Sequence, residues 1–201
     1  YLGDPDYVDN PIARLIADDY IAQRAREVNP DEISQLGAVQ PGLETPNTTH
    51  FSIVDQWGNA VSNTYTLNWN YGSGVVVEGA DFLLNNEMGD FSAKTGVPNS
   101  AGLVYGDANA IAANKRMLSS MTPTIVTKDG KNFMVIGTPG GPTIITTVLQ
   151  CIVNVIDHGM NIATATNAPR MHHQWYPDKL VIEAGFGPDT IRLLEKRGHT
   201  V

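Results

Sequence analysis

One segment of the sequence, Thr143–His158, restricts the possible fold more than any other. It has the length of an α-helix and is apolar over a broad part of its circumference, and Gly159 follows it as a helix stop. Polar residues interrupt the apolar run, so it is too short and too polar to cross a bilayer. A helix with so wide an apolar face has to pack against a sheet. The chain is therefore expected to build layers of helix and sheet.

Two β-hairpins are expected to supply strands for these layers. Residues 49–54 and 60–67 alternate in polarity on either side of a short loop. A second pair of strands, 124–128 and 132–136, flanks Asp129-Gly130, a dipeptide that favours a type I′ turn. Both hairpins are expected to be mostly buried, because their strands are rich in Val, Ile and Phe. The order of the elements indicates an α+β fold with antiparallel strands.

The first 47 residues differ from the rest in pattern and in charge. Asn10-Pro11 predicts the start of an amphipathic helix over residues 11–27, with Asn10 as its N-cap. The segment Gln40–Asn47 contains two prolines and a glycine, which is typical of an exposed loop. Residues 1–47 carry nine acidic and three basic side chains, whereas the rest of the chain is nearly balanced. A boundary therefore falls near residue 47.

The composition excludes several classes of function. The formal net charge of -8 gives no electrostatic attraction to nucleic acid, so nucleic acid is not an expected partner. The single cysteine, Cys151, rules out an internal disulfide and a zinc site built from several cysteines. The five histidines lack the spacing of a metal-binding helix, and the adjacent pair His172-His173 is unsuited to sharing one ion. No metal is therefore expected.

Thr48 is the first candidate for chemistry, because it lies where the proline-rich loop meets the first strand. A threonine hydroxyl is a weak nucleophile until a base stands beside it. If the Asn47–Thr48 bond were cut, the new α-amine, with a pKa of roughly 8, would be that base. Other interpretations remain open. The threonines can be ordinary strand residues, Asn47-Thr48-Thr49 can be a glycosylation sequon, and the loop can be clipped by an outside protease.

Three further segments carry polar groups that suit ligand binding. The segment Gly137–Gly141 joins a strand to the long helix, and its glycines suit an oxyanion or anion site, or simply a tight turn. Glu87 and Asp90 suit an ammonium group, although a solvated turn or a calcium loop is an alternative. Ser119-Ser120 offers hydroxyl donors on a connector, where serines are also ordinary turn residues.

Several segments, in one collinear order along the whole chain, resemble those of γ-glutamyltranspeptidases. They include Thr48–Ser52, Thr64–Asn68, Leu83–Ser92, Gly106–Ala110, Leu118–Pro123, Pro139–Gly141 and Asn167–Arg170. The resemblance implies an N-terminal-nucleophile hydrolase, a four-layer αββα sandwich with antiparallel sheets, of which this chain is a partial domain. It also implies that residues 1–47 are the end of the large subunit with its processing linker. Residues 48–201 then form the small, catalytic subunit, truncated at its C-terminus.

The resemblance further implies a zymogen that cuts itself between Asn47 and Thr48, after which the large and small subunits pair as a heterodimer. Thr48 would then take the γ-glutamyl group from glutathione or related amides and pass it to water, amino acids or peptides. No organic cofactor or metal is implied. A periplasmic or extracellular location is implied as well, with the signal segment outside this chain.

Individual roles carry over by position within the matching motifs. Thr66 is expected to hydrogen-bond the Thr48 hydroxyl, and the N–H groups of Gly140 and Gly141 are expected to form the oxyanion hole. The donor's α-amino and α-carboxylate groups are expected to be held by Asn68, Glu87, Asp90, Ser119 and Ser120.

The sequence also departs from the family pattern. The family's main carboxylate-binding arginine lies in the earlier part of the large subunit, outside this chain. Ala101 stands where many bacterial relatives have an aromatic gate, and Pro142-Thr143 follows the glycine pair where Ser-Arg is frequent. These departures keep two alternatives open. One is a cephalosporin or glutaryl amide acylase of the same family, and the other is an uncleaved, inactive relative that only binds.

Overall fold

The computed structural model describes residues 2–29, 31, 48–99 and 101–201. The chain divides into two compact units that each combine distant segments. The first unit contains Tyr1–Gly42, Gly89–Leu118 and His173–Val201, and the second contains Leu43–Met88 and Ser119–His172. These units reflect packing, and the boundary expected near residue 47 from composition and charge stays a prediction.

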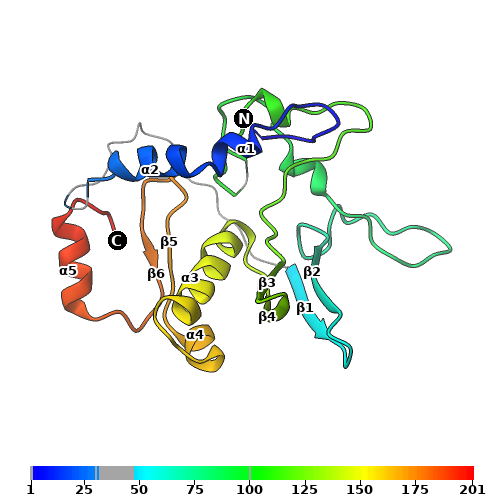
Figure 1. Cartoon of the computed structure of the whole chain (residues 1–201). Helices are drawn as coiled ribbons and strands as arrows, with labels where there is room; N and C mark the ends of the chain where they lie inside the picture. Colours follow the sequence, from blue (N-terminus) through cyan, green and yellow to red (C-terminus); the bar gives the residue numbers. More distant parts are fainter. Residues whose placement is uncertain (1, 30, 32–47, 100) are drawn as a thin grey trace. The chain divides into compact units, whose positions relative to one another are not determined.

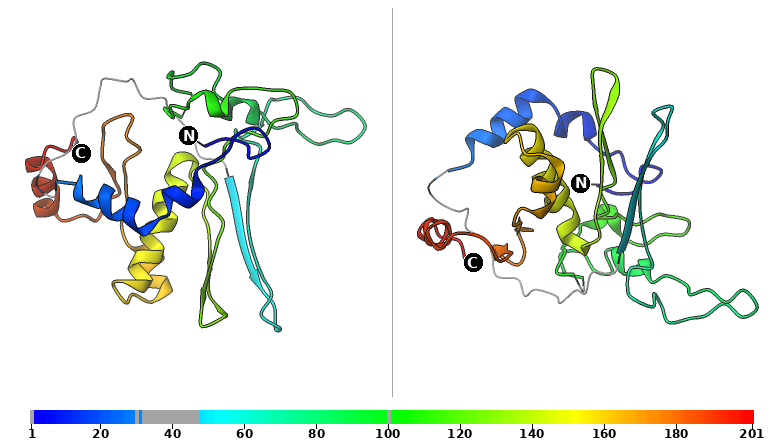
Figure 2. Two further views of the ribbon diagram at one scale, coloured as in Figure 1. Left: turned by 45° about the horizontal axis from the view of Figure 1, so that its top comes forward. Right: turned by 90° about the horizontal axis from the view of Figure 1, so that it is seen from below.

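The second unit is built on two antiparallel hairpins (Figure 1). Strand β1 (Thr48–Val54) pairs with β2 (Ala60–Thr66), and β3 (Thr124–Lys128) pairs with β4 (Lys131–Ile136). Asp129 and Gly130 both have positive φ angles, 52° and 73°, as a type I′ turn requires. The two hairpins lie side by side in all views, and β4 contacts both β1 and β2 (Figures 1 and 2). The predicted hairpins are therefore confirmed.

The long apolar helix follows the second hairpin. A short 3₁₀ turn, η3 (Gly141–Thr143), leads directly into α3 (Ile144–Ile156), which packs on α4 (Ile162–Asn167), and strand β5 (Met171–His172) follows. The core side chains of α3 are fully buried: Ile144, Val148 and Cys151. The Cys151 thiol donates to the carbonyl oxygen of Ala165 in α4, which agrees with a structural cysteine. Within the described residues, no helix is long and apolar enough to span a membrane.

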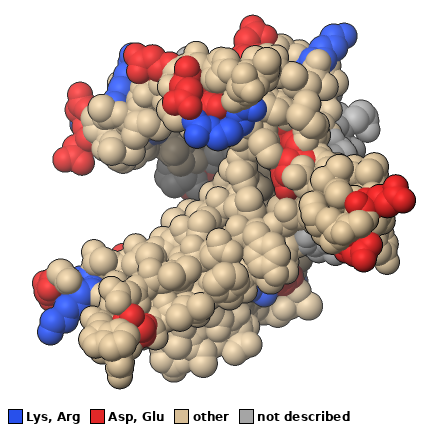
Figure 3. All heavy atoms as spheres, turned by 90° about the vertical axis from the view of Figure 1, so that its right-hand side faces the viewer, with Lys and Arg blue, Asp and Glu red and all other residues tan. Residues whose placement is uncertain are grey.

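The expectation that both hairpins are mostly buried is wrong. The face of β1–β2 that carries Phe51, Ile53 and Tyr65 points outward, and Ile53 and Tyr65 are 54% and 55% exposed. On α3, Leu149 is 57% exposed. Because strand side chains alternate, one face of the hairpin points inward while the other needs a further layer that the described chain does not supply. Figure 3 shows one face of the molecule, on which broad regions carry neither acidic nor basic side chains.

The first unit contains short helices connected by loops. They are α1 (Ile12–Leu15), α2 (Asp18–Arg26) and α5 (Pro188–Lys196), with the 3₁₀ turn η2 (Asp107–Asn109) and the short strand β6 (Val181–Ile182). The single helix predicted over 11–27 is wrong, because Ala17 adopts an extended conformation (φ −70°, ψ 135°) between α1 and α2. The predicted N-cap is also wrong, since the Asn10 side chain binds the backbone N–H and C=O of Gly3 instead.

Candidate active site

Thr48 is the first residue of β1 and lies directly opposite Thr66 of β2 in the antiparallel register. Side chains that are directly opposite in such a ladder share one face of the hairpin, with Cβ atoms about 5 Å apart. The structure therefore brings the two threonines that the sequence singled out onto the same face. Asn47 lies outside the described residues, so cleavage of the Asn47–Thr48 bond remains a prediction.

A turn after β2 fixes Asn68 beside Thr66. The Asn68 N–H donates to Thr66 Oγ1 at 2.8 Å, and Asn68 has a φ of 73°, a left-handed conformation that asparagine tolerates. The Asn68 side chain donates to the carbonyl oxygen of Asn86 at 3.3 Å. Asn86 in turn accepts from the Trp69 N–H at 3.1 Å and donates its own N–H to the Leu67 carbonyl. These bonds join the end of β2 to the segment that leads into Glu87.

Glu87 and Asp90 are the first and last residues of the 3₁₀ turn η1 (Glu87–Asp90). Side chains three residues apart in a 3₁₀ helix eclipse one another, so the turn directs both carboxylates to one side. The Asp90 carbonyl accepts from Nδ2 of the buried Asn109 at 2.7 Å. Asn86 and Asn109 are supporting residues that sequence reasoning did not assign. Both lie in segments that resemble the family, but their long-range hydrogen bonds leave no local signal.

The glycine loop, Gly137–Gly141, leads into η3 and α3 with positive φ angles at its last two residues. Gly140 has a φ of 142° and Gly141 a φ of 53°. Thr143 holds this conformation, since its N–H and its Oγ1 both donate to the Gly140 carbonyl, at 3.0 Å and 2.7 Å. The first N–H groups of a helix lack intrahelical acceptors, and the helix field there favours negative charge. The loop is thus suited to stabilising an oxyanion.

The two serines lie close to this loop. Ser120 Oγ donates to the Gly141 carbonyl at 3.1 Å, which connects the serine segment to the glycine pair. Ser119 Oγ accepts from the Met121 N–H at 3.1 Å and keeps its own proton for another acceptor. Of the predicted site residues, the second unit holds Thr48, Thr66, Asn68, Glu87, Ser119, Ser120, Gly140 and Gly141, and Asp90 belongs to the first unit.

His50 connects the strand of Thr48 to the glycine loop, and sequence reasoning assigned it no role. It shares a face of β1 with Thr48, and its ring contacts Thr64 Oγ1 at 2.8 Å and Ser52 Oγ at 3.0 Å. The ring lies against Gly137, where any Cβ would overlap it. Burial lowers the pKa of His50 below its ordinary value. A neutral imidazole therefore packs β1 against the end of β4.

The lowered pKa of His50 predicts a loss of stability in mild acid. Below the ordinary value of 6.5, the unfolded chain binds a proton at this side chain more readily than the folded protein does. The free energy of unfolding should therefore fall as the pH drops through that value. We expect His50→Gln to reduce this dependence in urea unfolding of the full-length protein between about pH 7.5 and 5.5. His158→Gln, at an exposed position, is the matched control and should keep the wild-type slope.

A pocket of about 420 Å³ opens next to Thr66. Its volume lies within the usual range for small-ligand sites, and aromatic side chains form much of its wall. The lining residues are Thr49, Tyr65, Thr66, Leu67, Trp69, Asn70, Phe82 and Leu83. Among the residues that the structure describes, no group of three or more His, Cys, Asp or Glu side chains is arranged to hold a metal ion.

Solved structures with the same arrangement define the fold class. A mutant γ-glutamyltranspeptidase from Helicobacter pylori is 61% identical with a TM-score of 0.74, covering 76% of this chain and 82% of that one. A cephalosporin acylase from Bacillus halodurans is 26% identical with a TM-score of 0.79, covering 99% of this chain and 34% of that one. The mixed helices and antiparallel strands are thus those of an N-terminal-nucleophile hydrolase, as expected from the sequence.

Sequence relatives identify the family within this class. The glutathione hydrolase proenzyme of Escherichia coli (strain K12) is 55% identical over 205 residues, which cover 100% of this chain and 35% of the relative. The Pseudomonas aeruginosa proenzyme is 57% identical over 188 residues, covering 94% of this chain and 34% of the relative. The γ-glutamyltranspeptidase family model matches residues 1–201, so the chain belongs to this family. It spans about a third of the length of these curated relatives.

Proposed function

We propose that this chain is part of a γ-glutamyltransferase, or glutathione hydrolase, that matures by cutting itself between Asn47 and Thr48. The observation that carries the proposal is the position of Thr48 at the head of β1, directly opposite Thr66. Two of the most similar curated relatives bear the name glutathione hydrolase proenzyme, and a related γ-glutamyltranspeptidase is described as undergoing autoprocessing. Residues 1–47 would then end one subunit and residues 48–201 would belong to the other.

Maturation begins with Thr48 Oγ attacking the carbonyl carbon of Asn47. The peptide C–N bond breaks as the C–O bond forms, so the acyl group moves from nitrogen to oxygen and leaves an ester. Water hydrolyses this ester, which gives a carboxylate on Asn47, the hydroxyl on Thr48 and a free α-amine at the new chain start. That amine is the base that the nucleophile needs during turnover.

Turnover repeats the acyl transfer on an external donor. The α-amine of Thr48 accepts the hydroxyl proton while Oγ attacks the γ-carbonyl, and the oxyanion forms hydrogen bonds with the N–H groups of Gly140 and Gly141. The tetrahedral intermediate collapses by expelling the amine, which takes the proton from the α-ammonium group. Water or the amine of an amino acid or peptide then attacks the γ-glutamyl ester and restores the free hydroxyl.

Donor recognition is assigned to paired charges and hydroxyls. The carboxylates of Glu87 and Asp90, with the Asn68 amide, suit the α-ammonium group of a γ-glutamyl donor. The hydroxyls of Ser119 and Ser120 suit its α-carboxylate. The bonds from Asn68 to Thr66 and from Ser120 to Gly141 support this assignment, because they fix two of these residues next to the proposed catalytic groups.

Asp90→Ala should weaken donor binding while maturation continues. A hydrogen bond to a charged group is worth about 1.5–3 kcal/mol, so we expect the donor KM to rise by roughly tenfold to hundredfold. Steady-state kinetics of the full-length enzyme with a γ-glutamyl anilide measure this change. Asp157→Ala, an exposed acid at the end of α3, is the control and should leave KM unchanged. An unaltered KM in Asp90→Ala would remove this residue from the donor site.

An amide acylase is the second candidate, favoured by the likeness to the cephalosporin acylase and by Ala101 and Pro142. Assays of the full-length protein with γ-glutamyl anilide and with glutaryl amides separate the two functions. We expect turnover of the former, and turnover of glutaryl amides alone would replace the proposal. A protein that stays as one band on a denaturing gel would instead be an uncleaved binding relative.

We also propose that the two pieces remain together as a heterodimer and act in the periplasm or outside the cell. The family resemblance supports the location, and the proenzyme names of the relatives agree with two subunits cut from one precursor. Cell fractionation followed by size-exclusion chromatography tests both statements.

A further inference from the structure

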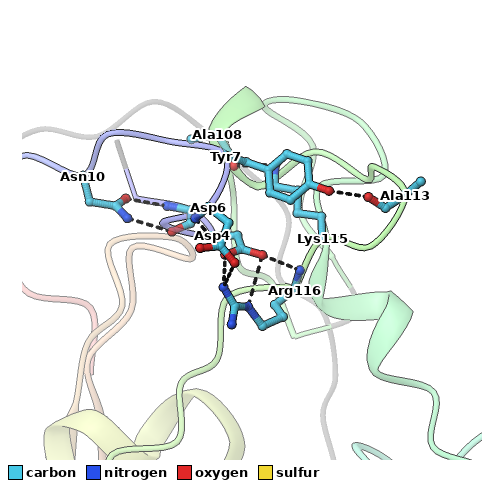
Figure 4. A network of polar contacts seen from close by, with 9 residues as sticks. Asp4, Asp6, Tyr7, Asn10, Ala108, Ala113, Lys115 and Arg116 are labelled. Carbon is cyan, nitrogen blue, oxygen red and sulfur yellow. Dashed lines mark hydrogen bonds and ion pairs between the residues drawn. The ribbon is translucent and has the colours of Figure 1, made fainter.

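A salt bridge joins the beginning of the chain to a loop more than a hundred residues later (Figure 4). The Asp4 carboxylate accepts from the Arg116 backbone N–H at 2.8 Å, from Nε at 3.2 Å and from Nη2 at 2.5 Å. The Asp4 side chain is 1% exposed, and Nη2 of Arg116 also reaches Asp6 at 2.6 Å. Two guanidinium nitrogens and a main-chain amide thus donate hydrogen bonds to one buried carboxylate. Such a charge-assisted contact is strong and fixes the orientation of both side chains.

Neighbouring residues extend this contact. The Tyr7 hydroxyl donates to the Ala113 carbonyl, and Lys115 Nζ lies 5.6 Å from the centre of the Tyr7 ring. Lys115 also donates to the carbonyls of Ala108 and Ala110 at 2.8 Å and 2.9 Å. At Gly3, an added Cβ would overlap the Ala108 carbonyl, so the two backbones touch directly. The segment Gly3–Asn10 is therefore fitted onto the segment Asp107–Leu118.

Hydrogen bonds within the segment Gly3–Asn10 also fix its own conformation. The Asn10 side chain accepts from the Gly3 N–H and donates to the Gly3 carbonyl, both at 2.9 Å. The N–H groups of Tyr7 and Val8 both donate to the Asp4 carbonyl at 2.9 Å. A loop held at both ends in this way presents Asp4 with little loss of conformational entropy on docking.

The receiving segment is tied to residues of the proposed donor site through Asn109. This side chain is 1% exposed; its Nδ2 donates to the Asp90 carbonyl at 2.7 Å and its Oδ1 accepts from the Leu118 N–H at 3.0 Å. Leu118 directly precedes Ser119-Ser120. Asn109 thus sets the backbone at Asp90 and at the residue before the serine pair.

We propose that the segment Gly3–Asn10 is an intersubunit strut: after cleavage it stays bound to Asp107–Leu118 through Asp4 and Arg116, and keeps the donor-binding residues in place. This inference rests on the proposed function, because the two segments lie in separate subunits only if the chain is cut after Asn47. Arg116 acts here as a positioning residue: it lies two residues before Leu118, whose N–H donates to Asn109, and it is assigned no contact with a reacting atom.

The charge state of the pair agrees with this role. Hydrogen bonds from the Arg116 side chain and backbone hold the pKa of Asp4 well below its ordinary value of 3.8. The nearby Asp6 and Lys115 keep the ion pair in a charged, polar setting. Both partners are therefore ionised at neutral pH, and the contact weakens only as the pH falls below that ordinary value.

Hydrogen exchange on the full-length enzyme tests the strut. Four proteins are compared: the mature wild type, the uncleaved Thr48→Ala precursor, mature Arg116→Met and mature Asp4→Asn. Asp4→Asn nearly preserves the shape of the side chain, so it still tests the contact if Arg116→Met misfolds. Arg192→Met, which removes an exposed ion pair with Asp189 in α5, is the matched control. The amides of Tyr7 and Val8 report on docking, and the donor KM and kcat report on the site.

We expect equal protection of these amides in the mature wild type and in the precursor. Arg116→Met and Asp4→Asn should exchange there at least about tenfold faster and raise the donor KM about tenfold, with cleavage and kcat nearly retained. Arg192→Met should match the wild type. Fast exchange in the mature wild type, or unchanged exchange and KM in both variants, would overturn the strut. A wild type that remains one band on a denaturing gel would instead refute the cleavage step itself, and the gel is read first.

Discussion

Replacing Thr48 by Ala will leave the full-length protein as a single chain and reduce γ-glutamyl turnover to background. The substitution removes the oxygen that attacks the Asn47 carbonyl and the donor carbonyl, so both reactions lose their nucleophile. Removing a catalytic nucleophile lowers kcat by about 10⁴-fold or more. A denaturing gel shows whether the chain is cleaved, and release of an anilide from a γ-glutamyl substrate measures turnover.

Thr49→Ala is the matched control for this experiment. Thr49 follows Thr48 in β1 but pairs with Tyr65 and belongs to the opposite face of the hairpin. Thr49 lines the pocket next to Thr66, but its replacement keeps the Thr48 hydroxyl, so the variant should be cleaved normally and still release the anilide. Cleavage that persists in Thr48→Ala would mean that an external protease cuts the loop, and the nucleophile would have to be sought elsewhere.

The second large effect is expected from Gly140→Ala. With φ at 142°, Gly140 has a backbone conformation that L-residues rarely adopt, and an added Cβ would lie 2.6 Å from Thr143 Oγ1. The Thr143 side chain would have to move and release its Oγ1 hydrogen bond to the Gly140 carbonyl, and the strained backbone would turn the Gly141 N–H away from the oxyanion. Loss of one oxyanion donor costs about 3 kcal/mol of barrier, so kcat should fall by about 100-fold or more.

Gly159→Ala separates this effect from simple backbone strain. Gly159 follows α3 with a φ of 65°, and a Cβ there meets nothing within 4 Å. The variant should lose about 1 kcal/mol of stability and keep its kcat. If Gly140→Ala changed only the stability, as the control does, the glycine loop would be a turn without a catalytic role.

The hairpins were predictable because their signals are local. Asp129-Gly130 supports positive φ at both turn positions, and the alternating residues on either side set the strands. The facing of Thr48 and Thr66 then follows from the register of β1 and β2. The backbone of the glycine loop was predictable for the same reason, because the positive φ angles of Gly140 and Gly141 are ones that glycine adopts readily. The oxyanion role of this loop stays a prediction.

The features that escaped prediction depend on distant parts of the chain. Burial of the β1–β2 hairpin depends on which layer covers it, and strand composition does not contain that information. Asn10 has the sequence of a helix cap, but Gly3 captures its side chain and the helix begins without it. His50 contacts Thr64 on the facing strand, and Asn109 donates to the carbonyl of Asp90, 19 positions away; no short sequence motif predicts such contacts.

Mass spectrometry of the active full-length enzyme tests the central claim most directly. We expect a small piece whose first residue is Thr48 with a free α-amine, and a γ-glutamyl group on that same residue when turnover is quenched in acid. A fully active enzyme in which Thr48 is still joined to Asn47 by a peptide bond would contradict it.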